Sequence, residues 1–180
     1  MRTRSASLSP IWDSGFTPPE RLLGDGWTLL PLHPRLAQSD LTAFRSCQVR
    51  LREELDWNGW PPEDFTLGDN IQDLTEHYSE FVKREAYAYS IQTPDACIGC
   101  IYIEPWHTGA QLAFWFIDAW LDRESQILTA VLGWLDEWPL EQVILPINAD
   151  NSRVQTVLRG MGLQTCDGPP GHVSFFRPEP

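Results

Sequence analysis

The segment from Ala110 to Ile147 constrains the fold more than any other part of this chain. Its first run, Ala110 to Ile117 (AQLAFWFI), is almost wholly apolar, which is typical of a largely buried strand. Glu124 to Trp138 then carries apolar residues at three- and four-residue steps, which indicates a helix, and Pro139 ends it. Gln142 to Ile147 (QVILPI) is a second buried strand. The three pieces predict a β-α-β crossover between two parallel strands.

Two amphipathic helices are expected before this crossover, after a first strand at Gly26 to Leu32 (GWTLLPL). Ser39 is a plausible N-cap of the first helix, whose apolar residues recur at helical steps as far as Leu55. The second helix begins near Asp69. Its inner stripe is predicted to consist of Ile71, Leu74, Tyr78, Phe81 and Val82.

The strands that follow show a period of two or continuous apolar runs. Tyr87 to Gln92 and Ala96 to Ile103 read as strands that form an antiparallel meander with the first strand of the crossover. After the crossover, Asn151 or Asp150 caps a short helix, and the final strands end with His172 to Phe176. The order β-α-α-β-β-β-α-β-α-β-β places the chain in the α+β class, with a mixed, mostly antiparallel central sheet flanked by helices.

Composition along the chain predicts its domain organisation and its cellular compartment. Residues 1–24, which proline and glycine punctuate, are expected to form an N-terminal arm, and residues 25–180 a single domain. No run approaches the roughly 18 apolar residues of a membrane span. No apolar signal core follows Arg2 and Arg4, and the four cysteines fit reduced thiols, so the sequence favours a cytoplasmic protein.

The chain is strongly acidic. A net charge of −12 and a pI near 4.6 argue against binding nucleic acid through a basic face and against adhesion to anionic membranes. The acid is concentrated from Glu53 to Glu85, where ten carboxylates meet only Lys83 and Arg84 and give a net charge of −8. Two interpretations stay open: a solvated helix face that keeps the protein soluble, or a field that attracts a cationic ligand.

Cys97 and Cys100 form a CxxC pair inside a predicted strand. On a regular strand, residues three apart point to opposite faces, whereas a zinc knuckle or a redox pair needs a turn or a helix start. Because no second cysteine pair lies nearby, no metal site is expected here.

The order of elements and the sequences GAQLAFWFIDAW, ESQILTAVLGWLDEW and VILPINADNSRVQTVLRGMGL resemble the GCN5-related N-acetyltransferase (GNAT) superfamily. The resemblance spans roughly Gly26 to Phe176. Its most specific piece is Asn148 to Leu163, where Asn151-Ser152 leads to Gly162-Leu163 at the spacing of the family. The resemblance implies an acetyl-coenzyme A site where the two parallel strands of the crossover splay apart.

The same resemblance implies which residues hold acetyl-coenzyme A. Backbone groups of Phe116, Ile117 and Asp118 would pair with the pantetheine arm. The start of the helix at Glu124 would hold the pyrophosphate, because helix N-termini offer free N–H groups to anions. For Asn151, helix capping is the alternative role. The residues assigned to the cofactor in this way are Phe116, Ile117, Asp118, Arg123, Ser125, Gln126, Asn148, Asn151 and Ser152.

This sequence departs from the family pattern at two places. In the pyrophosphate loop, commonly Arg-x-x-Gly-x-Gly/Ala, Arg123 is kept but Gln126 and Leu128 occupy the glycine positions. Glycine at these positions permits close approach of the backbone to phosphate. Leu158 stands where many members carry a tyrosine that protonates the departing thiolate.

Acetyl transfer to an amine needs a group that takes the proton of the amine. Glu104 and Asp118 follow consecutive strands of the meander and are the candidates for this catalytic base. The alternatives are a solvated hairpin carboxylate for Glu104 and a turn cap for Asp118. His107 carries a side chain suited to proton transfer, but it lies in a turn, where an exposed histidine is the simpler interpretation.

Trp57, Trp60 and Asp64 are the candidates for substrate binding. They lie between the first two helices, in a loop that covers the acceptor end in the family. Paired tryptophans near acids can surround a cationic amine. A hydrophobic lid or a contact in a homodimer is the alternative.

Two functions stay open at this point. The first is an acetyl-coenzyme A-dependent N-acetyltransferase that acts on a small or peptidic amine, cationic amines included. The second is a degenerate, non-catalytic GNAT-fold protein that binds a ligand or serves as a dimeric interaction module. Arg123 and Asn151-Ser152 favour the enzyme, whereas Gln126, Leu128 and Leu158 favour the second function.

Overall fold

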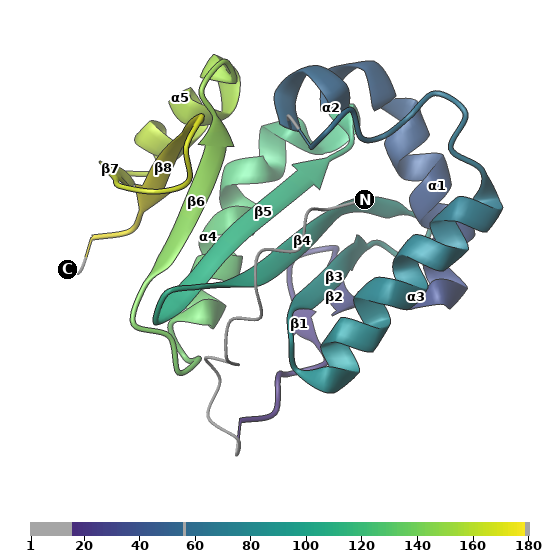
Figure 1. Ribbon diagram of the computed structural model, residues 1–180, viewed down its shortest axis with the longest axis horizontal. Coiled ribbons are helices and arrows are strands. Elements are labelled where there is room, and N and C mark those ends of the chain that lie inside the picture. Colours follow the sequence, from purple (N-terminus) through teal and green to yellow (C-terminus); the bar gives the residue numbers. More distant parts are fainter. Residues whose placement is uncertain (1–15, 56, 179–180) are drawn as a thin grey trace.

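The computed structural model describes residues 16–55 and 57–178. The described residues form one eight-stranded sheet in which every neighbouring pair of strands is antiparallel except one. The strands are β1 (Leu22–Leu23), β2 (Thr28–Pro31), β3 (Tyr87–Gln92), β4 (Cys97–Trp106), β5 (Gly109–Phe116), β6 (Val143–Asn148), β7 (Gln164–Cys166) and β8 (His172–Phe176). Their spatial order is β1-β2-β3-β4-β5-β6-β8-β7. The predicted mixed, mostly antiparallel sheet of an α+β fold is therefore confirmed (Figure 1).

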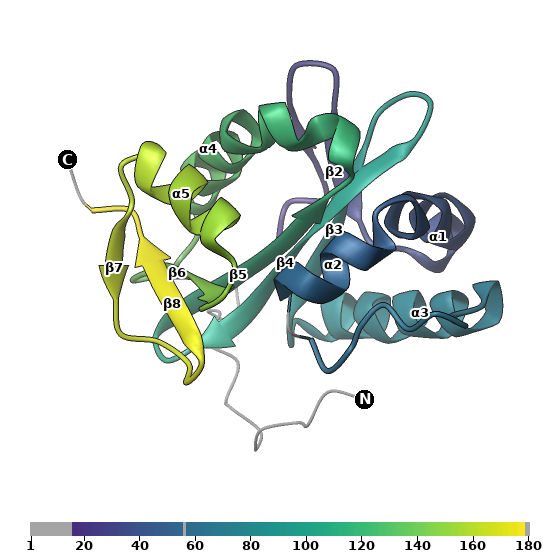
Figure 2. The ribbon, with the colours of Figure 1, turned by 90° about the horizontal axis from the view of Figure 1, so that it is seen from above.

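Helices cover both faces of this sheet, as the view from above shows (Figure 2). The helices are α1 (Ala37–Ser46), α2 (Gln48–Leu55), α3 (Leu67–Lys83), α4 (Glu124–Leu135) and α5 (Ser152–Gly160), with short 3-10 turns at Pro34–Leu36 and Asp118–Arg123. The first three lie on one face, and α4 and α5 lie on the other. Each face has its own buried apolar cluster. Within the described part of the chain, no helix combines the length and the apolar character that crossing a bilayer requires.

The helical region before the meander differs from the prediction in three respects. The single helix expected from Ser39 to Leu55 is broken at Cys47, whose backbone leaves the helical region, and the hydroxyl of Ser39 donates to the Leu36 carbonyl instead of capping the helix. The next helix begins at a Thr66 capping box. Its predicted inner stripe was wrong at two positions: Ile71 is 44% exposed and Val82 is 65% exposed, while Leu74 and Phe81 are buried.

The two parallel strands of the crossover touch over a very short stretch. Ala110 pairs with Val143 and Gln111 pairs with Ile144, and no further pairs follow along β5 and β6. Gly109 permits this contact, because a Cβ atom there would lie 1.9 Å from the Gln142 carbonyl oxygen. The strands therefore start together and splay apart toward their carboxyl ends, as the family resemblance implies.

The splay also explains a proline inside β6. Pro146 is paired with Ser174 of β8, but it lies beyond the last residue of β6 that pairs with β5. Proline cannot donate a hydrogen bond to a second neighbouring strand. At this position none is required, so Pro146 is compatible with a strand in the middle of the sheet.

A β-bulge overturns the prediction for the two strand cysteines. Ile91 pairs with Gly99, yet the next residue of β3, Gln92, pairs with Cys97, so Ile98 is an extra residue in β4. The extra residue shifts the alternation of side chains by one. Cys97 and Cys100 consequently point to the same face and share the buried cluster beneath α1, while Ile98 lies in the opposite cluster.

We predict that Gly109→Ala destabilises the fold by about 1–3 kcal/mol, because the added methyl group forces β5 and the Gln142 carbonyl apart. Gly133→Ala is the matched control: nothing lies within 4 Å of its Cβ position on α4. That change should be neutral or stabilise the protein by up to about 1 kcal/mol. Urea unfolding of the two variants measures both values, and equal stabilities would contradict the proposed close contact.

Candidate functional site

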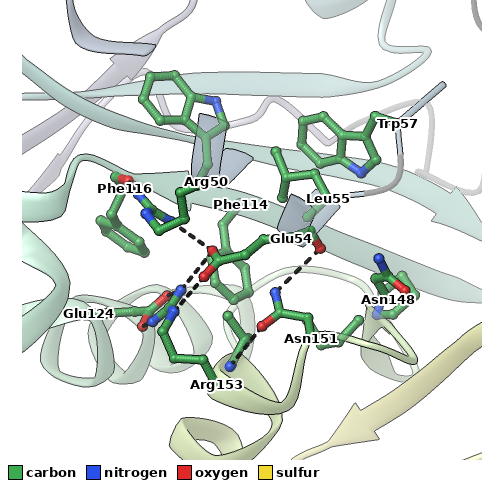
Figure 3. A pocket seen from close by; sticks show the side chains of 15 residues that line it. Arg50, Glu54, Leu55, Trp57, Phe114, Phe116, Glu124, Asn148, Asn151 and Arg153 are labelled. Atoms are coloured by element: carbon green, nitrogen blue, oxygen red, sulfur yellow. Dashed lines mark hydrogen bonds and ion pairs between the residues drawn. The ribbon is translucent and has the colours of Figure 1, made fainter. Parts of the chain in front are cut away.

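A pocket lies where β5 and β6 diverge. The carboxyl half of β5 and the end of β6 form its two sides, α2 covers it, and the first residues of α4 and α5 close its base (Figure 3). The free space is about 30 Å³, which admits one or two water molecules. Charged side chains lie in the splay together with apolar and amide-bearing ones. The lining residues used below are Arg50, Glu54, Trp57, Phe116, Glu124, Asn148, Asn151 and Arg153.

Two arginines and two glutamates form a continuous ion-pair chain across the splay, here called the splay network (Figure 3). Arg50 Nη1 lies 2.6 Å from Glu54 Oε2, and Arg153 Nε lies 2.7 Å from Glu54 Oε1. Arg153 Nη1 also lies 2.7 Å from Glu124 Oε2. Glu54 is the central member, because both guanidinium groups contact its carboxylate.

The protonation of the splay network follows from its geometry. Burial alone would raise the pKa of Glu54, but hydrogen bonds and charge from Arg153 and Arg50 outweigh it and lower the pKa. Burial opposes the charged form of Arg153 in the same way, and the two glutamates reverse the effect and raise its pKa. Glu54 and Arg153 therefore stay ionised at neutral pH.

Local features of the chain place Arg50, Glu54 and Glu124 of the splay network. Arg50 and Glu54 are one helical turn apart on α2. Glu124 is the first residue of α4, where the helix dipole favours a carboxylate, and it is only 1% exposed. Asn151 caps α5 by accepting from the Val154 N–H, and its amide donates to the Glu54 carbonyl, which holds the end of α2 against α5.

The backbone at the end of β5 is already engaged. Arg50 Nη2 donates to the Phe116 carbonyl oxygen at 2.5 Å, and Arg50 Nε donates to Asp118 at 2.7 Å. The carboxylate of Glu124, the first residue of α4, is likewise already paired with Arg153. A pantetheine arm or a pyrophosphate would therefore have to displace groups of the protein itself at both places.

Four of the residues predicted from the sequence meet at this pocket: Trp57, Phe116, Asn148 and Asn151. The side-chain oxygen of Asn148 accepts from the Asp150 N–H, so Asn148 also shapes the turn before α5. The predicted capping role of Asn151 is confirmed.

The residues predicted for the pyrophosphate lie around the outer ends of α4 and α5. Arg123 donates to Asp25 and stacks over the ring of Trp120. Ser125 and Gln126 are exposed and line a surface groove between α4 and α5, and Ser152 is the exposed first residue of α5.

The remaining predicted residues are more dispersed. Asp118 lies beside the pocket, paired with Arg50, and Ile117 precedes it as a half-buried residue. Glu104 is opposite Gln111, at the end where β5 and β6 touch, and is not part of the pocket wall. His107 is an exposed turn residue.

The candidate acceptor residues form an aromatic wall beside the pocket. The rings of Trp57 and Trp60 are 5.5 Å apart, and Trp57 meets Tyr102 edge-on at 5.4 Å. Trp60 also packs on Phe44 at 5.3 Å. Asp64 is exposed and is not a lining residue.

The site predicted from the sequence lacks three residues that the structure places in the pocket: Arg50, Glu54 and Arg153. Arg50 and Glu54 have the spacing of a helical ion pair, but that spacing is common on solvent-exposed helices. Arg153 carries no signal, since its partner Glu54 is 99 residues away in the chain. Glu124 is visible in the sequence as a charge that conflicts with a phosphate site.

We predict that Arg153→Met lowers the free energy of unfolding by about 3 kcal/mol, because it leaves the buried Glu124 carboxylate without its cation. Arg159→Met on the exposed side of the same helix is the control; within the described part of the chain, Arg159 donates to Gln155 and lies over the Phe175 ring. It should cost less than about 1 kcal/mol.

Adding Glu124→Gln to the Arg153→Met variant tests the cause of this loss. The second change removes the buried charge and should restore more than about 1 kcal/mol. Urea unfolding of the single and double variants gives the comparison, and a further loss in the double variant would contradict the explanation.

A family profile described as an acetyltransferase (GNAT) domain matches residues 32–164. No curated protein matches the chain significantly in sequence. Solved structures do match in fold, at identities too low to indicate more than the fold.

Three of these structures are acetyltransferases. RimL, a ribosomal L7/L12 alpha-N-protein acetyltransferase, has a TM-score of 0.70 at 14% identity and covers 86% of this chain and 91% of its own. The ribosomal-protein-S5-alanine acetyltransferase from Vibrio fischeri has a TM-score of 0.68 at 12% identity. The match covers 87% of this chain and 95% of the Vibrio fischeri chain. The microcin C7 self-immunity acetyltransferase MccE, solved with acetyl-CoA and AMP, has a TM-score of 0.73 at 12% identity. The match covers 89% of this chain and 97% of the MccE chain.

The profile match extends over most of the chain, from before α1 to the start of β7, and includes the splayed strands and both helices at the base of the pocket. The resemblance noted from the sequence is thereby confirmed, and the protein belongs to the GNAT acetyltransferase family.

Proposed function

We propose that this protein is an acetyl-coenzyme A-dependent N-acetyltransferase whose acceptor is an amine on a peptide or a small molecule. The observation that carries the proposal is the splay of β5 and β6 after two residue pairs, with a pocket at the point of divergence. Diverging strands leave backbone groups of β5 without a strand partner, and an extended amide-containing arm can pair with such groups. MccE, a protein of the same fold, is solved with acetyl-CoA.

In this proposal the splay network opens when the cofactor enters. The free space of about 30 Å³ does not hold a pantetheine arm, so Arg50 must release the Phe116 carbonyl. The pyrophosphate then takes the place of the Glu124 carboxylate at the N-terminus of α4. Arg153, which is half-exposed, becomes available as a cation for the phosphates.

Acetyl transfer exchanges a carbon–sulfur bond for a carbon–nitrogen bond. The amine nitrogen forms a bond to the acetyl carbon, the carbon–sulfur bond breaks, a base takes the amine proton, and the thiolate leaves with a proton or beside a positive group. Leu158 is fully buried and cannot supply that proton. Arg50, on the pocket wall, is the group that we propose stabilises the thiolate.

Two candidates for the base stay predictions. Asp118 lies beside the pocket, next to Arg50. Glu104 lies at the closed end of the splay and accepts a hydrogen bond from Gln111. The geometry favours Asp118 on proximity alone.

The aromatic wall indicates the class of acceptor. Trp57 and Trp60 offer aromatic rings beside the pocket, and the loop that carries them and the helix α3 that follows it are rich in carboxylates. RimL and the Vibrio fischeri enzyme are named as ribosomal-protein acetyltransferases. A peptide that presents a cationic amine is the acceptor that fits these features best.

We predict that acetyl-coenzyme A binds the wild-type protein and that Glu124→Gln tightens binding about two- to fivefold, because it removes a negative charge from the α4 N-terminus. Glu63→Gln is the control, since Glu63 is an 87% exposed partner of a surface ion pair. Calorimetric titration measures all three affinities.

The outcomes of this titration separate the two functions left open by the sequence. No binding to the wild type or to Glu124→Gln at millimolar ligand would overturn the acetyltransferase proposal and favour the non-catalytic alternative. If Glu124→Gln leaves the affinity for acetyl-coenzyme A unchanged, the pyrophosphate does not bind at the N-terminus of α4.

We also predict that peptides with lysine and arginine near a free N-terminus are acetylated faster than matched peptides with aspartate and glutamate. Added salt should reduce this preference, since it screens exposed charges. Trp57→Ala should raise KM for the basic peptide by about tenfold, whereas Trp106→Ala, in the hairpin at the far end of β4, should not. Release of free thiol measures the rates; equal turnover of both peptides at low salt would contradict a cationic acceptor.

A further inference from the structure

Two thiols and a carboxyl group lie together beneath α1, away from the pocket. Cys100 Sγ is 3.2 Å and Cys97 Sγ is 4.0 Å from Asp40 Oδ1, and the three groups place one ligand atom each within 4.8 Å of one another. All three residues are buried, with exposures of 3% for Asp40, 2% for Cys97 and none for Cys100. The bulge in β4 creates this arrangement, because it turns both cysteines toward Asp40 of α1.

The cluster holds a buried carboxyl group that no lysine or arginine of the described residues neutralises. The hydrogen-bond donors to Asp40 are Asn70 and the two thiols, and no lysine or arginine of the described residues forms an ion pair with it. Burying a carboxylate without a cation is costly. Next to it, Asn70 Oδ1 is buried with no hydrogen-bond partner in the described structure. A bound cation would compensate this local excess of acceptor atoms.

We propose that Asp40, Cys97 and Cys100 bind a Zn²⁺ ion. Zinc ligands are thiolate sulfurs at about 2.3 Å and carboxylate oxygens at about 2.0–2.2 Å in tetrahedral geometry, which places sulfur and oxygen ligands about 3.5 Å apart. The observed separations of 3.2 and 4.0 Å lie on either side of that value. The three residues supply three of the four ligands of a tetrahedral site.

Binding is a simple exchange of protons for metal. The two S–H bonds give way to two S–Zn bonds, the two protons leave to solvent, the carboxylate binds as the anion, and no atom changes its oxidation state. Because all three ligand residues are buried, the site offers no open position for a substrate. The ion in this proposal is therefore structural. It ties α1 to the bulge of β4 through Asp40 and Cys97, which are 57 residues apart in the chain.

The test uses the full-length protein and Zn²⁺ alone as the ligand. The chain is unfolded in guanidinium with a reductant and a chelator, transferred to metal-free buffer, and refolded with or without Zn²⁺. Metal content after dialysis and the thermal midpoint are measured for the wild type, Cys97→Ser, Cys100→Ser and Cys47→Ser. Cys47→Ser is the matched control, because Cys47 is a buried thiol outside the cluster.

We expect close to one Zn²⁺ per wild-type and Cys47→Ser chain, and a rise in their thermal midpoints of about 5 °C or more. Either cluster substitution should abolish both effects. Refolding with Co²⁺ gives a readout that does not depend on the variants, since thiolate ligation of cobalt produces a near-ultraviolet charge-transfer band. Wild-type protein that retains no zinc and shows no such band, or equal zinc loss in Cys47→Ser and Cys100→Ser, would overturn the proposal.

Discussion

The brief parallel contact between β5 and β6 is the constraint on which the rest of the site depends. The strands pair at Ala110 and Gln111 and then separate. Gly109 permits this contact, because the Gln142 carbonyl oxygen lies too close to it for a side chain at that position. Separation exposes strand edges inside the protein, and buried backbone groups require partners. Arg50 donates a hydrogen bond to the Phe116 carbonyl oxygen. The amide of Asn151 donates to the Glu54 carbonyl and so holds α2 over the gap.

The splay network is the consequence of filling such a gap with charged side chains. None of its four members is favourable alone in a half-buried position, but each has an oppositely charged partner within 2.7 Å. The same arrangement occupies the place where a GNAT protein would receive an anionic cofactor. In the proposed function, binding energy of the cofactor is therefore partly used to replace internal ion pairs by ion pairs with the ligand.

Regular patterns were reliable guides where the physics is local. The strand Tyr87–Gln92, the start of α4 at Glu124 and the cap of α5 at Asn151 appear in the structure as predicted. The break at Cys47 was missed because the apolar period continues through it. The exposure of Val82 was missed because periodicity shows that a helix has an apolar face, not how much of that face the sheet covers.

The sequence by itself determined the class of fold, the crossover and the family, since these depend on periodicity and on residues close together in the chain. Only the tertiary structure decided what occupies the splay, because Glu54 and Arg153 meet across 99 residues and no local pattern records that contact. The tertiary structure also decided that Cys97 and Cys100 face the same side. That depends on one extra residue in β4, and a bulge arises from the register with the neighbouring strand, which the spacing of the two cysteines does not contain.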